Sequence, residues 1–180
     1  MGLDMYLRKT KRVEGVAVDQ YDGIDNVLPS TIQEFRKSGG LEKLCPEFKN
    51  ASKLDICVRE KGVHYKYLSL FEEVGYWRKA NHIHSWFVQN CQGGIDECQL
   101  TEVSKEQLEK LLVDCIDILN NSDSILIAKE TLPTQSGFFF GGTEYDEYYF
   151  NDIRDTIDIL KATLETTDFE EEIVFYRSSW

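Results

Sequence analysis

Two neighbouring stretches of alternating apolar and polar residues constrain the fold of this chain most. Residues 53–59 (KLDICVR) and 63–69 (VHYKYLS) both alternate with a period of two, which is typical of a β-strand with one buried face. Glu60, Lys61 and Gly62 lie between them and suit a tight connection. The pattern therefore predicts a β-hairpin over 53–69.

Residues 2–8 (GLDMYLR) alternate in the same way, and 172–176 has the character of a closing strand. Residues 9–28 are polar and interrupted by glycines, which predicts a long loop. Three apolar residues share the expected buried face of the first strand: Leu3, Met5 and Leu7.

Serine followed three residues later by glutamine marks two helix starts, because the two side chains cap the first turn reciprocally. Ser30 and Gln33 predict a short helix that stops at two glycines near residue 40. Ser104 and Gln107 predict a longer helix over 104–120.

The stretch from Glu73 to Phe87 (EVGYWRKANHIHSWF) holds two of the three tryptophans and two of the three histidines. At 100° per residue, a helix over 73–91 has a wide apolar arc and is expected to be largely buried. Asn81 and His84 fall inside this arc, whereas His82 faces the opposite side and is expected to be exposed. Two interpretations of Asn81 and His84 stay open, hydrogen bonding within a core and contact with a ligand.

A third long helix is expected over 144–165, with Thr143 as its N-cap, after a loop over 132–142. The apolar residues 124–128 fit either a strand or a helix. Strands and helices in mixed order, with hairpin connectivity, predict an α+β fold. We expect an antiparallel sheet packed against about three main helices in a single domain, residues 1–180.

Composition narrows the function. A net charge of −12 argues against a nucleic acid as partner, because the chain has no basic stripe. No apolar run is long enough to cross a membrane, and the N-terminus lacks the features of a signal peptide, so a cytoplasmic protein is expected. The five cysteines include no CxxC pair and indicate reduced residues. Composition leaves the oligomeric state open.

The chain shows no pattern of a metal site or a cofactor site. His82 and His84 lie about 200° apart on a helix, so they do not meet at one ion. Ser136 with His84 and an acid suggests a hydrolase, yet the GxSxG motif is missing. The glycines around 137–142 lack the lysine of a phosphate-binding loop. We therefore expect no metal and no cofactor.

Aromatic residues are unusually dense just before the third long helix. Phe138, Phe139 and Phe140 are followed closely by Tyr145, Tyr148 and Tyr149. Two interpretations stay open: core packing with one exposed ring, or a wall on which a planar ligand such as a nucleobase stacks.

Three blocks carry a resemblance to a known family: MGLDMYL at 1–7, EVGYWRKANHIHSWF at 73–87 and LPTQSGFFFGGTEYDEYY at 132–149. In these blocks the chain resembles a family of small bacteriophage and prophage proteins without an established activity. The resemblance implies a small accessory protein in the host cytoplasm that modulates a host process or counters a defence system.

We expect the three blocks to converge on one pocket, whose aromatic walls and few donors suit a small polar, nucleotide-like ligand. A binding protein is the leading hypothesis. The alternatives are an acidic interaction module that inhibits a host protein and a hydrolase of unknown substrate. The expected ligand-binding residues are Asp4, Tyr6, Trp77, Arg78, Asn81, His84, Gln135, Ser136, Phe139 and Tyr145.

Overall fold

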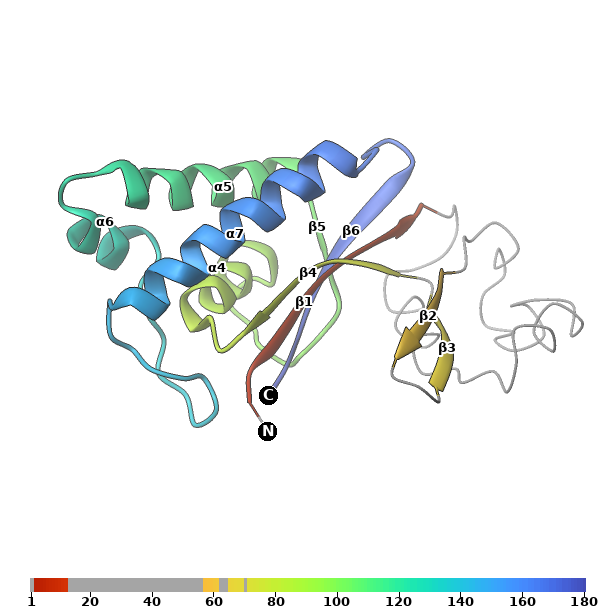
Figure 1. Ribbon diagram of the computed structural model, residues 1–180, viewed down its shortest axis with the longest axis horizontal. Coiled ribbons are helices and arrows are strands. Elements are labelled where there is room, and N and C mark those ends of the chain that lie inside the picture. Colours follow the sequence, from red (N-terminus) through yellow and green to blue (C-terminus); the bar gives the residue numbers. More distant parts are fainter. Residues whose placement is uncertain (1, 13–56, 62–64, 70) are drawn as a thin grey trace, which may run out of the picture. The chain divides into compact units, whose positions relative to one another are not determined.

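The computed structural model describes residues 2–12, 57–61, 65–69 and 71–180 (Figure 1). The chain divides into two compact units. The main unit comprises residues 1–8, 73–169 and 174–180, and the second unit comprises 9–72 and 170–173. The single domain expected from the chain length stays a prediction, because compactness alone does not define an independently folding domain.

A four-stranded antiparallel sheet forms one layer of the fold. Its outer strand β5 pairs with β6 so that Thr101 lies opposite Tyr176 and Val103 opposite Val174. The strands expected over 2–8 and 172–176 are confirmed as β1 and β6. In sheet order the strands are β4 (Glu72–Arg78), β1 (Asp4–Lys11), β6 (Glu172–Ser179) and β5 (Thr101–Val103).

The described helices are α4 (Asn81–Cys91), α5 (Lys105–Asn120), α6 (Ser124–Thr131) and α7 (Glu147–Thr166). Figure 1 shows α4, α5 and α7 together on one side of the strands. The expected α+β class is confirmed. Residues 124–128, which fitted either a strand or a helix, belong to α6. In the described ranges, no helix combines the length and the apolar character needed to cross a membrane.

The core lies between the sheet and these helices. Leu3, Met5 and Leu7 are fully buried in it, while Asp4 and Tyr6, which alternate with them, are only half-buried. The alternation in the sequence therefore identified the correct face of β1. Burial of these apolar side chains against the helices is the main force that holds the two layers together.

The continuous helix expected over 73–91 is wrong, because its first part is the edge strand β4. Only residues from Asn81 onward form α4. The chain turns at Lys79, which has a positive φ of 64°, and the Lys79 N–H donates to the Leu3 carbonyl at 2.8 Å. Apolar spacing over so short a stretch fits a strand as well as a helix, and pairing with β1 decided between them.

Two helix starts test the expected caps. The reciprocal cap of α5 is confirmed: Ser104 Oγ accepts from the Gln107 N–H at 3.2 Å, and Gln107 Oε1 accepts from the Ser104 N–H at 2.9 Å. The cap of α7 is Asp146 and not Thr143. Its Oδ1 accepts from two free N–H groups of the first turn, at 3.0 and 3.2 Å, and a carboxylate at this end is also favoured by the helix dipole.

The hairpin belongs to the second unit. Strands β2 (Cys57–Lys61) and β3 (Tyr65–Ser69) pair antiparallel, with Cys57 opposite Ser69 and Lys61 opposite Tyr65. The hairpin is thus confirmed. The expectation that it belongs to the main sheet is wrong, because β2 and β3 form a separate two-stranded sheet. The loop expected over 9–28 is wrong for residues 9–11, which extend β1. Residues 13–28 and the short helix expected after Ser30 lie outside the described residues.

Gly75 of β4 lies where a side chain has no room. A Cβ at this position would lie 2.5 Å from Cγ2 of Ile159 on α7. We expect Gly75→Ala to lower the free energy of unfolding by about 1–3 kcal/mol, the usual cost of overpacking, measured by chemical denaturation. Gly142→Ala is the matched control, because a Cβ there has no neighbour within 4 Å. An unchanged stability of Gly75→Ala would mean that α7 does not pack on β4 in this way.

Candidate functional site

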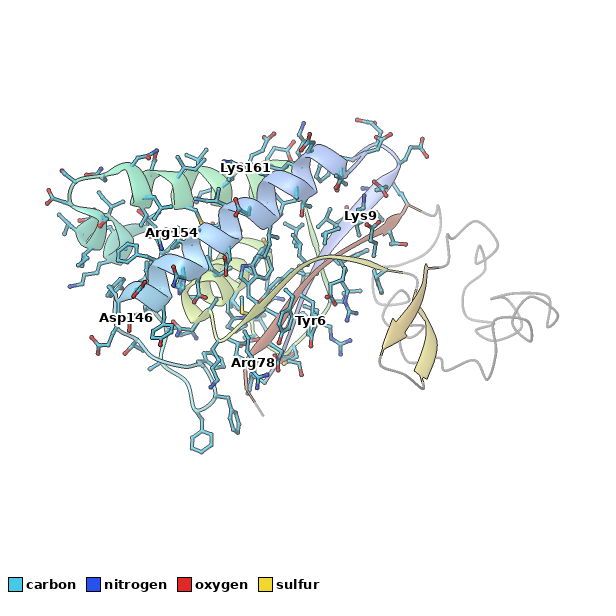
Figure 2. The ribbon with its side chains drawn as sticks, viewed as in Figure 1. Tyr6, Lys9, Arg78, Asp146, Arg154 and Lys161 are labelled. Carbon is cyan, nitrogen blue, oxygen red and sulfur yellow. The ribbon has the colours of Figure 1, made fainter. Side chains whose placement is uncertain are left out.

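A pocket of about 310 Å³ lies in the main unit, between the β4–α4 turn, the loop before α7 and the first turns of α7. Figure 2 shows Arg78 at the end of β4 and Asp146 at the start of α7, which contribute to two sides of this pocket. The ionisable and aromatic residues that line it are Arg78, Lys79, His82, Glu144, Asp146, Tyr148, Tyr149 and Asp152.

The side chain of Asn81 holds the loop against α4. Its Nδ2 donates to the carbonyls of Phe140, at 3.1 Å, and Gly142, at 2.7 Å. Its Oδ1 accepts from the N–H of Gln135 at 2.9 Å. One buried amide thus fixes three points of the loop, so Asn81 builds the pocket wall through its own hydrogen bonds. This is the first of the two interpretations of Asn81 that the sequence left open.

Two glycines let the loop pack closely. A Cβ at Gly137 would lie 2.5 Å from the ring of Phe140, which is itself buried. Gly141 has a φ of +91° and packs against Lys79, where a Cβ would lie 3.0 Å from the Lys79 Cβ. A side chain at Gly137 would displace the Phe140 ring within the loop, and a side chain at Gly141 would push the loop away from Lys79.

His82 is the most informative residue of the pocket. It is 2% exposed, its ring lies 4.1 Å from that of Tyr149, and its buried Nε2 has no hydrogen-bond partner. Burial lowers the pKa of His82 to about 3, so the imidazole is neutral at pH 7. The expected exposure of His82 is wrong because α4 begins at Asn81, which places His82 in the first turn, under Tyr149 of α7.

Asp152 also has an unusual environment. Burial is the main cause that raises its pKa to about 7, and the negative charges of Asp155 and Asp146 add to it. A substantial fraction of Asp152 is therefore protonated near neutral pH. An ionisable group of perturbed pKa in a pocket is a candidate functional residue.

His84 lies on another part of α4 and is satisfied completely. Its Nδ1 is 2.7 Å from the Tyr176 hydroxyl, and its Nε2 is 2.9 Å from a carboxylate oxygen of Asp96. It is fully buried, as expected, and burial lowers its pKa despite the bond to Asp96. Because both ring nitrogens are engaged, His84 has no atom left to act as a base toward Ser136.

The other expected site residues do not all meet at the pocket. Asp4 accepts a hydrogen bond from the Tyr76 hydroxyl, and the ring of Tyr6 lies 5.4 Å from that of Tyr76. The indole N–H of Trp77 donates to Thr156 Oγ1 at 2.8 Å, within the core. Of the ten expected residues, Arg78 and Asn81 line the pocket.

The remaining expected residues belong to the loop that forms one wall. The Phe139 carbonyl accepts from the Leu3 N–H at 3.1 Å, and the Tyr145 hydroxyl accepts from the Thr134 N–H at 3.2 Å. Ser136 is exposed. Gln135 donates its backbone N–H to one of the three hydrogen bonds of the Asn81 side chain, which together form the Asn81 clamp. These residues shape the loop and do not line the pocket described above.

Sequence reasoning missed His82, Tyr149 and Asp152 as one group. Tyr149 and Asp152 are three residues apart, and hence on one face of α7, but nothing in the sequence indicated that this face meets His82. In the described part of the chain, no group of three His, Cys, Asp or Glu residues is arranged to hold a metal ion. Comparison of the chain with protein-family models, with curated proteins and with solved structures finds no match.

Removing the Asn81 clamp tests the wall of the pocket. Asn81→Ala loses three hydrogen bonds at about 1 kcal/mol each, so we expect the free energy of unfolding to fall by about 2–3 kcal/mol. Hydrogen exchange at the backbone amide of Gln135 should also become faster, because the variant lacks the Asn81 Oδ1 atom that accepts its hydrogen bond. Gln135→Ala is the control, since the backbone N–H that Asn81 binds is retained. Slow exchange at Gln135 in Asn81→Ala would contradict the clamp.

The raised pKa of Asp152 predicts a pH-dependent stability. Between about pH 4 and pH 7 the folded protein keeps a proton that the unfolded chain loses, so Asp152 lowers the stability as the pH rises through this interval. Asp152→Asn removes this effect. The melting temperature of the variant relative to wild type should therefore be higher at about pH 8 than at about pH 4.5. Asp158→Asn, an exposed acid of the same helix, should show no such difference.

Proposed function

We propose that this protein binds a small polar ligand in the pocket under the β4–α4 turn. The observation that carries the proposal is the Nε2 atom of His82, which is buried in the pocket lining without a hydrogen-bond partner. Leaving such an atom unsatisfied costs about 1–3 kcal/mol. Buried polar groups without partners are rare in native proteins and need an explanation. A ligand that completes the hydrogen bond of His82 supplies one.

The dimensions and the walls of the pocket support a compact molecule with a planar part. Its volume of about 310 Å³ lies at the lower end of the range of small-molecule sites. The rings of Tyr148 and Tyr149 line it, and Tyr148 is largely exposed beside it. Arg78 and Lys79 provide positive charge for an anionic group. A nucleotide or a nucleotide-like signalling molecule combines these features.

The biological role follows the resemblance to phage and prophage proteins. An accessory protein of that kind would use this pocket to sequester a host nucleotide, and thereby counter a defence system that depends on it. No covalent chemistry is required for sequestration, which agrees with a His84 whose two nitrogens are both occupied.

His82→Phe tests the proposed site. The variant keeps a ring against Tyr149 but removes the unsatisfied nitrogen, so the empty protein should be as stable as wild type or about 1 kcal/mol more stable. Native mass spectrometry of freshly purified protein and a thermal-shift screen of nucleotides and metabolites are used to identify the ligand. At 100 times its dissociation constant, a ligand stabilises wild type by about 2.7 kcal/mol, and His82→Phe should lose this gain.

The control for this screen is Val113→Ala, an exposed position on α5 that is not part of the pocket. It should keep the full thermal shift. A ligand that stabilises wild type and His82→Phe equally binds elsewhere, and the absence of any ligand would contradict the proposal.

A second candidate function is binding of a host protein through the tip of the same loop. Phe138 is 94% exposed and lies edge-on to Phe139, with ring centroids 4.7 Å apart. The Asn81 clamp and the bond from Leu3 to Phe139 hold this tip in place. Aromatic anchors on a preorganised loop are typical of interaction hot spots.

Phe138→Ser separates this function from the first. Because the side chain is exposed, we expect its stability to stay within about 0.5 kcal/mol of wild type. A host protein that co-purifies in a fixed ratio with wild type should be lost from Phe138→Ser and retained by Val113→Ser. Equal recovery with all three proteins would exclude the loop tip as the binding surface.

A further inference from the structure

The pocket contains charges of both signs that do not neutralise one another. Arg78 and Lys79 come from the β4–α4 turn, whereas Asp146 and Asp152 come from the cap and the first turns of α7. The nearest carboxylate to Arg78 is that of Asp4, at 4.0 Å. Among the described residues, no ion pair joins a cation of the pocket to one of its carboxylates. The site is therefore divided into a cationic side and an acidic side.

We infer that the pocket binds a nucleotide whose base carries an exocyclic amino group. This amino group donates a hydrogen bond to Asp152, and the phosphate lies against Arg78 and Lys79. This inference rests on the proposed function and adds the ligand class to it. It distinguishes adenine, guanine and cytosine, which carry an exocyclic amino group, from uracil, which does not.

The acidic side selects a hydrogen-bond donor. The Asp146 carboxylate already accepts two backbone N–H groups through Oδ1. The Asp152 carboxylate has no hydrogen-bond partner among the described residues, although it is half-buried. Ionised carboxylates only accept hydrogen bonds, so they favour an amino group over a carbonyl oxygen at this place. His82 lies in the same lining with one free nitrogen, a second partner for the edge of a base.

The cationic side is held in place by the backbone. The Lys79 N–H donates to the Leu3 carbonyl at 2.8 Å, and the Lys79 carbonyl accepts from the Asn81 N–H at 2.8 Å. Lys79 adopts a φ of 64°, which non-glycine residues adopt rarely and which persists only where the surroundings enforce it. The backbone from which the Lys79 side chain extends is thus fixed before a ligand binds, which lowers the entropic cost of binding an anion.

Binding of an amino group should be coupled to the proton of Asp152. In the empty pocket, burial first and then the nearby acids favour the protonated form, whereas a hydrogen-bond donor favours the carboxylate. Affinity for the base should therefore rise as the pH rises through about 7. Other charged and titratable groups line the pocket with Asp152 or shift its pKa. They are Asp155, Asp146, Glu144, Arg78, Lys79, His82, Tyr148 and Tyr149.

The experiment is a calorimetric titration of the purified full chain with AMP, GMP, CMP and UMP, and with the matching nucleosides. At least one amino-bearing nucleotide should bind at least tenfold more tightly than UMP, a difference of about 1.4 kcal/mol. Its nucleoside should bind more weakly than the nucleotide. Asp152→Asn should abolish the preference over UMP, and Arg78→Gln should weaken the nucleotide but not the nucleoside. Asp158→Asn is the control and should change neither.

The pH series uses the nucleoside, because the phosphate of a nucleotide titrates in the same range. Its affinity for wild type should rise between about pH 6 and about pH 8, and Asp152→Asn should flatten this rise. Equal binding of UMP and the amino-bearing nucleotides, with loss in His82→Phe, overturns the ligand class and leaves the proposed function standing. Binding of a different ligand that lacks an amino group, with loss of this binding in His82→Phe, also overturns the ligand class and leaves the proposed function standing. If nothing binds in the pocket, both proposals fail.

Discussion

The hydrogen bonds of the Asn81 side chain are the constraint on which the rest of the site depends. They join the first residue of α4 to backbone groups 54 to 61 residues further along the chain. A loop rich in glycine has many conformations, and ordering it costs conformational entropy. The clamp compensates for part of this cost at a buried place, where the amide does not exchange these bonds for water. The loop wall and the start of α4 are consequently held together by one residue.

The two histidines of α4 show how similar burial leads to different roles. His84 is bonded through both nitrogens, to Tyr176 and Asp96, and ties α4 to the sheet and to the following loop. His82 is buried to almost the same extent but leaves Nε2 without a partner. The first arrangement is typical of a core histidine, and the second is the observation behind the proposed ligand site. Asp152 adds to this contrast, because the burial that raises its pKa places an acid of near-neutral pKa in the same pocket.

Charge and shape separate the two surfaces that this unit offers. The whole chain carries a net charge of −12, yet the pocket holds two cations beside its carboxylates, an arrangement suited to a small ligand with both kinds of group. The loop tip instead presents an apolar ring, Phe138, to solvent. Since the Asn81 clamp holds both the pocket wall and the tip, both surfaces depend on the same loop conformation.

Local pattern was enough to predict several elements of this protein. Alternation identified β1 with Leu3, Met5 and Leu7 inward, and the Ser104 and Gln107 pair identified the start of α5, because both signals depend on neighbours in sequence. The α+β class also followed from the sequence. What the tertiary structure decided is the strand over Glu72–Arg78, the burial of His82 and the packing of His82 against Tyr149. Each of these depends on partners distant in sequence, namely β1 for the strand and α7 for the histidine. The hydrophobic periodicity of one segment does not indicate which distant segment it will pack against.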